Sequence, residues 1–406
     1  MSRYVSHPAV NLQTATARAT DEDRISPPPT RRKPVISEAH DLPEPSPTRP
    51  TGKSRRGGAG KRGSATVNLR DVARVAEVSV ATVSLVLNGS ERISRGTADR
   101  VRAVMNQLGY RPNRLAQSLS GKYVKVLGAV LPDLRNAFAD AYFGQLLAGV
   151  TDAAQERGFK MLLEQAKTEW ISEGSHMELF ERRFVDGVLL FGHTDESVYA
   201  ADFCREKFPA LAVDNRLDCP QCEHIDYVAS DYRKGAEQVM NYLAQLGHRH
   251  IGLLEAAPQI ATVRDKRQAW ENKLRELGVE PSASRVRDGH FTEMGGADAC
   301  RDLMQAHPET TAILAMSDKM AIGAMSYLQR QDLKVPGDVS VVGFDDLPHA
   351  AFVQPALTTI HLPLYDVGRR ACIRLIERVE GKRDHVRESL DTHLVIRDST
   401  SIARRA

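Results

Sequence analysis

The sequence is poor in cysteine, in aromatic residues and in long apolar runs. It has five cysteines among 406 residues, a sparse and odd-numbered set that favours a reducing compartment over a disulfide framework. Its longest apolar stretches, such as residues 126–131, are far shorter than the roughly 20 residues that span a bilayer, which excludes a membrane span. The N-terminus also lacks the apolar segment of a secretory signal peptide. We therefore expect a cytoplasmic protein.

The composition suits two or three globular domains whose charge is unevenly distributed. Hydrophobic residues make up 42% of the chain and charged residues 26%. Residues 1–121 carry twenty Lys and Arg against ten Asp and Glu, so with a net charge of +3 overall, residues 122–406 carry −7. A basic N-terminal segment followed by an acidic remainder of the chain indicates a polyanionic partner, with nucleic acid as the leading candidate.

The first 66 residues differ in composition from the rest. Nine of the twenty prolines lie in the first 50 residues, and Tyr4 is the only aromatic residue before position 67. Such a segment buries too little apolar surface to offset its conformational entropy. We predict that residues 1–66 form a disordered, Pro-rich, basic extension. Its stretch 55–63 is either a plain linker or an arm that weakly contacts phosphate groups.

Residues 67–112 have the pattern of three short helices. Apolar residues recur at helical spacing in 69–76, in 80–86 and in 97–108, and Gly109 suits the end of the third helix. Only a tight turn separates the first two runs, and Ser79 can cap the second. This arrangement predicts a helix-turn-helix head.

After Gly121 the pattern changes to strands alternating with amphipathic helices. The apolar runs are of strand length and nearly continuous, which is typical of parallel sheets covered on both faces. Two successive sets of such units, separated near residues 225–230, predict an α/β core of two doubly wound lobes. Ligands of such sheets bind at the carboxyl ends of the strands.

Several motifs, in a constant order, resemble the lactose-repressor (LacI) family. They are Val67–Ala73, Val78–Ser84, Leu87-Asn88, Gly109–Leu119, Val185–Val188, Leu246–Arg249, Ser317–Ala324, Val341–Asp346, Pro355–Ile360 and Arg397–Thr400. Each is weak alone, but together they cover residues 67–400 and leave the N-terminal extension outside.

The resemblance implies a transcription regulator, most simply a repressor, that binds a near-palindromic operator in double-stranded DNA as a homodimer or a tetramer. It implies a helix-turn-helix head over 67–112, a hinge helix over 113–121 and a two-lobed, periplasmic-binding-protein-like core over 122–400. A small carbohydrate-derived effector bound between the lobes would change the affinity for DNA.

The second helix of a helix-turn-helix enters the major groove. Val80, Ala81 and Leu85 would then face base edges, and apolar contact with thymine methyl groups is expected because none of them can form a bidentate hydrogen bond. Short hydroxyl and amide groups on this groove-facing helix can reach backbone phosphate oxygens, which predicts a further set of phosphate-contacting residues. They are Ser79, Thr82, Ser84 and Asn88. For Ser79 the alternative is a helix cap, and for Thr82 and Ser84 a solvated helix face.

Two further features of the head follow from the resemblance. Asn113 belongs to the DNA-contacting set, and Leu119 would wedge into the minor groove from the hinge helix. The alternative is that Leu119 packs within a linker helix. Glu77 stands at a turn position where the family usually has Gly or Asn, so we expect a left-handed backbone there at a cost of about 1 kcal/mol.

Candidate effector ligands lie where predicted strands end. They are Asp133, Asn136, Asp214, Ser317, Asp318 and Asp345. Ionised carboxylates at such positions suit a polyhydroxylated ligand, because each accepts two or more hydrogen bonds. Asp318 is as well explained by a helix cap. The resemblance adds Phe291 for the face of a sugar ring, and one of Phe138, Tyr142 and Phe143 is expected to line the cleft.

The family places an Arg three residues before a Gly-aromatic pair, where it clamps the ligand. In this sequence the corresponding position is Lys266, and an Arg follows as Arg267. An anionic effector such as a sugar acid or sugar phosphate would suit the cluster of Arg264, Lys266 and Arg267. A solvated charge run at a helix start explains the same residues, so a sugar, a sugar acid and a sugar phosphate all stay open.

One motif falls outside the resemblance. Cys219 and Cys222 form a CxxC pair with His224 beside them, which suits a surface loop better than a metal or redox site, because no second CxxC follows. No catalytic motif is present, and we expect no enzymatic activity, no metal ion and no cofactor. The alternatives to a regulator are a cytoplasmic sugar-binding module and a sugar-acting enzyme fused to a DNA-binding head.

Overall fold

The fold was analysed in a computed structural model, which describes residues 67–87, 90, 92–110, 123–134, 137–194, 197–217, 225–382 and 386–404. The chain divides into two units, Met1–Thr66 and Val67–Ala406. Every element named below belongs to the second unit. The predicted extension, over residues 1–66, lies outside the described residues.

The head has three helices where the sequence predicts them. They are α1 (Leu69–Val75), α2 (Val80–Leu87) and α3 (Arg95–Leu108). Val72, Val83 and Val101 are fully buried where the three helices meet. Gly109 ends α3 with φ 61°, a left-handed conformation that glycine adopts without steric cost. The helix-turn-helix prediction is confirmed.

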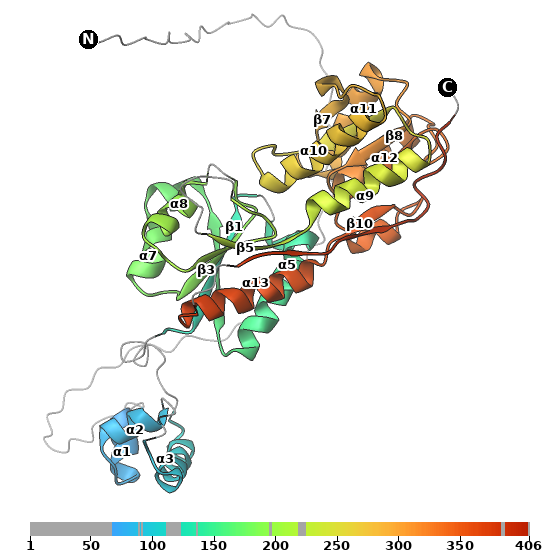
Figure 1. Ribbon diagram of the computed structural model, residues 1–406. Coiled ribbons are helices and arrows are strands. Elements are labelled where there is room, and N and C mark those ends of the chain that lie inside the picture. The colour runs from blue at the N-terminus through green and yellow to red at the C-terminus, as the bar shows by residue number, and fades with distance from the viewer. Residues whose placement is uncertain are drawn as a thin grey trace, which may run out of the picture. The chain divides into compact units, whose positions relative to one another are not determined.

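The N-terminal lobe is built on a fully parallel six-stranded sheet in the order β11-β5-β4-β3-β1-β2. Its strands are β1 (Val126–Pro132), β2 (Lys160–Ala166), β3 (Gly187–Phe191), β4 (Ala210–Val213), β5 (Asp226–Ser230) and β11 (Arg387–Leu390). One face packs on α5 (Ala141–Glu156) and α13 (Leu364–Val379), and the other on α7 (Ser175–Glu181) and α8 (Val198–Arg205), as Figure 1 shows. The short α6 (Thr168–Ser172) precedes α7.

The C-terminal lobe has a parallel four-stranded sheet in the order β7-β6-β8-β9. Its strands are β6 (Ile251–Glu255), β7 (Val286–Asp288), β8 (Ala312–Ala315) and β9 (Ser340–Val342). The surrounding helices are α9 (Tyr232–Gln245), α10 (Ala261–Glu276), α11 (Glu293–Ala306) and α12 (Asp318–Arg330). A small antiparallel pair, β10 (Thr359–His361) and β12 (His393–Val395), completes the fold.

The two lobes are not simply the two halves of the sequence. Strand β5 still belongs to the first sheet, and α13 and β11 return to the N-terminal lobe after β9 has completed the second sheet. The expected boundary near residues 225–230 is therefore only the first of several crossings between lobes. Near-continuous apolar strands look alike in both lobes, so periodicity does not reveal which sheet a late strand joins.

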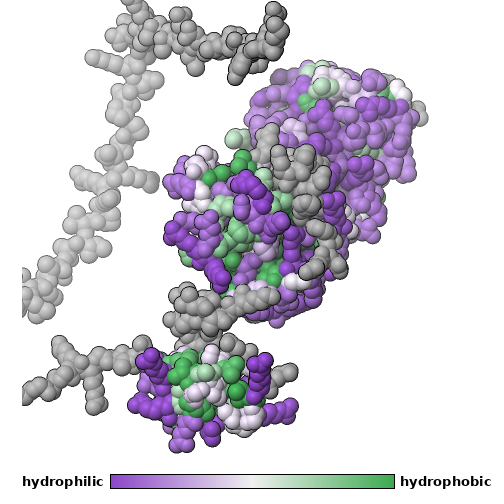
Figure 2. All heavy atoms as spheres, turned by 60° about the vertical axis from the view of Figure 1, so that its left-hand side comes forward, coloured by the Kyte–Doolittle hydropathy of each residue, from purple (hydrophilic) through white to green (hydrophobic). Residues whose placement is uncertain are grey.

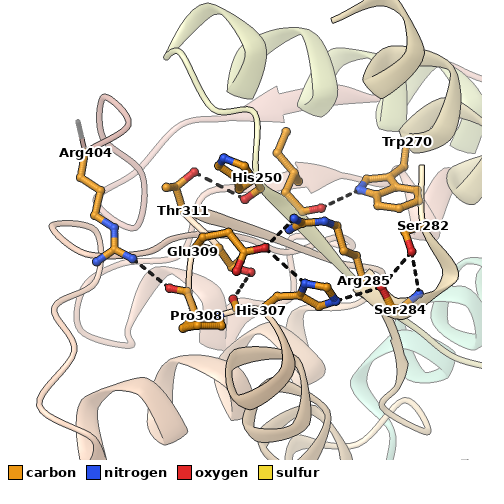
Figure 3. Close-up of polar contacts among 12 residues, drawn as sticks. His250, Trp270, Ser282, Ser284, Arg285, His307, Pro308, Glu309, Thr311 and Arg404 are labelled. Atoms are coloured by element: carbon orange, nitrogen blue, oxygen red, sulfur yellow. Dashed lines mark hydrogen bonds and ion pairs between the residues drawn. The ribbon is translucent and has the colours of Figure 1, made fainter. Parts of the chain in front are cut away.

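Polar side chains hold together the amino edge of the C-terminal lobe's sheet, where β7 and β8 begin. The carboxylate of Glu309 accepts a hydrogen bond from Arg285 (2.6 Å) and lies 3.2 Å from the His307 ring. The other ring nitrogen of His307 is 2.9 Å from the Ser284 hydroxyl. Arg404 donates to the carbonyl oxygen of Pro308 (3.2 Å), as Figure 3 shows. We call Ser284, Arg285, His307 and Glu309 the amino-edge network.

Candidate functional site

The amino end of α2 presents the first of the predicted DNA-contacting residues. The Ser79 hydroxyl accepts a hydrogen bond from the backbone N–H of Thr82 (3.0 Å) and lies 2.9 Å from the Thr82 hydroxyl. This contact satisfies an N–H of the first helical turn that would otherwise lack a partner. Ser79 therefore has the capping role considered above, and any contact with phosphate would come in addition to it.

The two sides of α2 differ in exposure. Val83 and Val86 are buried in the head, whereas Val80 and Leu85 expose 42% and 38% of their surface. Ala81 is also exposed. Figure 2 shows hydrophobic residues at the surface of the head among hydrophilic ones. An outward apolar surface on this helix is suited to thymine methyl groups and not to bidentate readout of guanine.

The turn between α1 and α2 has the strained backbone that the sequence predicts. Glu77 has φ 52°, in the left-handed region that side chains other than glycine and asparagine rarely adopt. The conformation costs about 1 kcal/mol relative to glycine, and the packing of the two helices must offset this cost.

Residues from both lobes form a group that we call the interlobe cluster: Asp214, Tyr232, Lys266 and Asp345, which are buried, and Tyr142, which is half-buried. Asp214 follows β4 and is 2% exposed. Its carboxylate accepts hydrogen bonds from the hydroxyls of Tyr142 (2.7 Å) and Tyr232 (2.6 Å). Burial raises the pKa of Asp214, although the tyrosine hydrogen bonds oppose the shift.

Lys266 supplies the positive charge of the interlobe cluster. It lies on α10, is 3% exposed, and donates a hydrogen bond to the carbonyl oxygen of Met316 (3.0 Å). Its Nζ atom is 4.8 Å from the ring centroids of Tyr232 and Phe344, within the range of a cation–π contact. Burial lowers the pKa of Lys266 to about 8, and the carboxylate of Asp345 is the strongest influence against this shift.

Asp345 and Asp318 bring further negative charge to the same place. Asp345 follows β9 and is 7% exposed, and its φ of 127° is a conformation that favours glycine. Burial and then the neighbouring Asp318 hold the pKa of Asp345 well above its usual range, while Lys266 acts in the opposite direction. Burial also raises the pKa of Asp318 to about 6, despite hydrogen bonds from Thr359 (2.5 Å) and the Leu347 N–H (2.7 Å).

Ion pairs connect the lobes around the interlobe cluster. Lys319 of α12 reaches Asp140, which caps α5, at 2.5 Å. Asp265 of α10 accepts a bidentate contact from Arg216, which follows β4, and a further hydrogen bond from Arg233 (3.0 Å). Burial opposes ionisation of Asp265, but these arginines outweigh it and hold its pKa below the usual value. Groups able to bind a polar ligand are thus present on both lobes.

Comparison with known proteins identifies this architecture. Residues 68–113 match the family of bacterial regulatory proteins of the lacI family, and residues 124–398 match the periplasmic binding proteins and sugar binding domain of the LacI family. The chain belongs to the LacI family. The transcriptional regulator GalS of Salmonella typhimurium is 32% identical over 318 residues, which cover 78% of this chain and 92% of GalS.

Two further relatives agree with this assignment. The transcriptional repressor CytR of Escherichia coli is 29% identical over 346 residues, covering 84% of this chain and 98% of CytR. The lac repressor dimer bound to operator and an anti-inducer superposes with a TM-score of 0.70 at 28% identity, covering 82% of this chain and 99% of that one. This LacI-family protein is a DNA-binding transcription regulator and not an enzyme.

In this LacI-family regulator some of the predicted effector residues lie in or beside the interlobe cluster, and the others lie elsewhere or have another structural role. Asp214, Lys266 and Asp345 meet in the interlobe cluster, and Asp318 lies beside them. Ser317 is 4% exposed and is the N-cap of α12. The capping role considered for Asp318 therefore belongs to Ser317, one residue earlier, and Asp318 is the first residue of the helix.

The structure does not bring the predicted basic residues of α10 together. Arg267 pairs with Glu255 (2.9 Å) and Glu271 (3.2 Å), and Arg264 donates to a backbone carbonyl oxygen. Only Lys266 reaches the interlobe cluster. Successive positions on a helix point about 100° apart, so neighbouring basic residues need not share a face. The patch of three cations considered for an anionic ligand is therefore not formed.

The remaining predicted side chains are less enclosed. Asp133, after β1, is exposed. Phe291 is half-buried against the main core and has φ 52°. Of the three aromatic residues near the start of α5, Phe138 is exposed, Phe143 is buried in the core, and Tyr142 contacts Asp214 through its hydroxyl.

Sequence reasoning missed Tyr232, Arg216, Arg233 and Asp265. Tyr232 comes two residues after the end of β5, as the first residue of α9, and Arg216 comes two residues after Asp214. The rule that ligands bind at strand ends covers both positions, so it could have found them if aromatic and basic residues had been considered along with carboxylates. Arg233 and Asp265 lie inside helices and carry no such signal.

Several predictions fall on residues outside the described part of the chain. These are the DNA-contacting roles of Asn88, Asn113 and Leu119, the cleft role of Asn136, and the Cys219, Cys222 and His224 motif. In the described part of the chain, no helix is long and apolar enough to cross a membrane. No group of three or more His, Cys, Asp or Glu residues there is arranged to hold a metal ion.

Proposed function

We propose that this protein is a homodimeric repressor of the cytoplasm whose affinity for a near-palindromic operator is set by a small sugar-like effector bound at the interlobe cluster. The observation that carries the proposal is the burial of Asp214, Lys266 and Asp345 at the junction of two lobes. Carboxylates whose charge is disfavoured by burial gain from a ligand that donates hydroxyl hydrogen bonds to them.

The cluster also supplies a route from ligand to DNA. A ligand shifts the DNA-binding equilibrium only by its differential affinity for two conformations. Asp214 comes from the N-terminal lobe and Lys266 and Asp345 from the C-terminal lobe, so a ligand that contacts all three prefers one arrangement of the lobes. Coupling of this kind typically amounts to about 1 to 3 kcal/mol.

Relatives support the choice of effector class and of assembly. One solved relative is described as a complex of the regulator CelR with cellobiose; it has 30% identity, a TM-score of 0.64, and covers 82% of this chain and 99% of that one. The lac repressor relative is described as a dimer on its operator. A two-fold dimer places two heads on two half-sites, which is the reason to expect a near-palindromic sequence.

The test is a gel shift on the promoter region of the protein's own gene, with and without each sugar of a panel. We expect one sugar class to change operator affinity by about 5- to 150-fold, the range of a coupling of 1 to 3 kcal/mol. The logarithm of affinity should fall with the logarithm of salt concentration with a slope steeper than about −3. Turnover of a sugar, or a sugar that binds without any effect on DNA affinity, would favour the enzyme or the plain sugar-binding module instead.

A further inference from the structure

A polar cavity of about 350 Å³ adjoins the interlobe cluster. We call it the arginine pocket, and its lining includes Arg216, Ser230, Arg233, Thr262 and Asp265. We propose that the arginine pocket binds an oxyanion, a phosphate or carboxylate group carried by the effector. This inference rests on the proposed function for its role in regulation, but not for the binding itself.

The contacts of Asp265 show that the two guanidinium groups are arranged for an oxyanion. Arg216 binds both carboxylate oxygens of Asp265, and Arg233 donates to one of them (3.0 Å). Bidentate contact is the geometry in which guanidinium groups recognise carboxylate and phosphate. Asp265 therefore occupies the two arginines as an intramolecular carboxylate, and a free oxyanion entering the cavity would compete with it.

Two helices begin at the arginine pocket. Arg233 is the second residue of α9, a helix of 14 residues, and Thr262 is the second residue of α10, a helix of 16 residues. No side chain caps α10, because its N-cap residue is Ile260. The first N–H groups of a helix and its dipole favour a negative charge, so the start of α10 adds to the attraction of the arginines, whereas the carboxylate of Asp231, which also lines the cavity, already caps α9.

A buried hydroxyl in the lining points independently to a missing polar partner. Ser230 is 4% exposed, and its Oγ atom forms no well-aligned hydrogen bond among the described residues, although it lies close enough to the Asp214 carboxylate to help lower the pKa of Asp214. Buried hydroxyl groups in folded proteins nearly always have a partner. An oxyanion in the adjoining cavity would accept a hydrogen bond from this hydroxyl.

Ser230 also joins the arginine pocket to the interlobe cluster. Its backbone N–H donates to the Asp214 carboxylate (2.7 Å), and Tyr232, which also lines the cavity, donates to the same carboxylate. One ligand could therefore place hydroxyl groups at Asp214 and an anionic group between Arg216 and Arg233. The oxyanion would take the place of the Asp265 carboxylate at the two arginines. The direct contact between Arg216 of one lobe and Asp265 of the other would then be replaced by a contact through the ligand.

The direct experiment uses inorganic phosphate as the probe on the full-length protein. Melting temperatures are measured in phosphate and in chloride at the same ionic strength and pH. We expect phosphate to raise the melting temperature of the wild type, because a ligand that binds only the folded state stabilises it. Arg216→Gln and Arg233→Gln should each reduce the rise to the general stabilisation that phosphate gives a folded protein through exclusion from its surface. Asp265→Asn removes the competing carboxylate and should enlarge it.

The control is Arg275→Gln, which removes a surface arginine from α10, the helix that carries Asp265, outside the cavity, and should leave the phosphate effect unchanged. If phosphate stabilises neither the wild type nor Asp265→Asn, or if both arginine variants keep the full effect, the pocket does not bind an oxyanion. An arginine variant that melts at a much lower temperature in chloride is disregarded, and the other one decides.

A second measurement separates this inference from the proposed function. Operator binding is compared for neutral sugars and their phosphorylated or oxidised counterparts, such as glucose, glucose 6-phosphate and gluconate. If only neutral sugars change operator affinity, the proposed function stands and the pocket has no part in recognising the effector. If phosphate binds the pocket but no sugar of either kind affects operator binding, the pocket stands and the proposed function falls.

Discussion

The two edges of the C-terminal lobe's sheet carry charged groups in opposite settings. At the amino edge, Glu309 is 42% exposed and pairs with Arg285 and His307, as Figure 3 shows. At the carboxyl edge, Lys266 and Asp345 are more than nine-tenths buried, and burial opposes the charge of each. Neighbouring Arg285 and His307 stabilise the charge of Glu309. Burying the charges of Lys266 and Asp345, in contrast, costs folding free energy.

Backbone strain is concentrated at the carboxyl edge, although Asp332, in the connection from α12 to β9, also has a positive φ of 57°. His290 and Phe291, which follow β7, both have φ 52°, and Asp345 after β9 has φ 127°. Residues in such conformations cost of order 1 to 3 kcal/mol each and cluster where function requires them. The carboxyl edge thus combines strain with buried charge, and this combination, more than the presence of polar residues, distinguishes the proposed binding site from the amino-edge network.

The largest expected effect is on ligand response at the carboxyl edge. Asp345→Asn keeps the size of the side chain but removes its charge and replaces an acceptor oxygen with a donor. We expect it to remove most of the coupling between effector and operator, about 2 kcal/mol or roughly 30-fold in affinity, while ligand-free operator affinity stays near that of the wild type. Asp214→Asn should act in the same direction with a smaller effect.

Operator affinity with and without the effector measures this change for each variant. Loss of DNA binding in ligand-free Asp345→Asn, or a full ligand response, would make Asp345 a structural residue. The two edges would then not differ in function.

The next effect is a pH dependence that only the carboxyl edge should show. Lys266 titrates near pH 8 in the folded protein and near 10.5 when unfolded, so between these values the unfolded chain binds more protons. Stability from this group must therefore rise with pH across that window. We expect the free energy of unfolding of the wild type, relative to Lys266→Met, to rise by about 1 to 2 kcal/mol from pH 7.5 to 9.5.

Urea unfolding at the two pH values measures the difference. Lys273→Met, which changes another lysine of α10 that pairs with Glu276, serves as the matched control and should follow the wild type. If the free energy of unfolding of the wild type does not rise between the two pH values relative to that of Lys266→Met, burial does not lower the pKa of Lys266.

The features that could be predicted from the sequence are those with a local signal. Strand ends are visible in a sequence, and they placed Asp214 and Asp345 correctly at the carboxyl edges of the two sheets. The family resemblance located Lys266. The three helices of the head followed from local signals, with Ser79 and Gly109 at the helix ends.

Other features depend on contacts between distant segments. The return of β11 to the first sheet, next to β5, involves residues more than 150 positions apart. The pairing of Arg216 with Asp265 likewise depends on how two lobes meet. Helical periodicity did not indicate that Arg267 would pair with Glu255, because that requires knowing which side of α10 faces β6. Local patterns place a residue on an element but do not determine its partner.

The smallest effect is expected at the amino edge and is the most direct test of the comparison. Glu309→Gln keeps the shape of the side chain but removes the charge that pairs with Arg285. Partly exposed ion pairs contribute about 0 to 1 kcal/mol, so we expect the free energy of unfolding to fall by about 0.5 kcal/mol, with no change in operator affinity or ligand response. Urea unfolding and the gel shift measure the two quantities on the same preparation. A loss of several kcal/mol would show that the amino-edge network is a buried structural element, and an altered ligand response would show that the conformational change reaches this edge of the sheet.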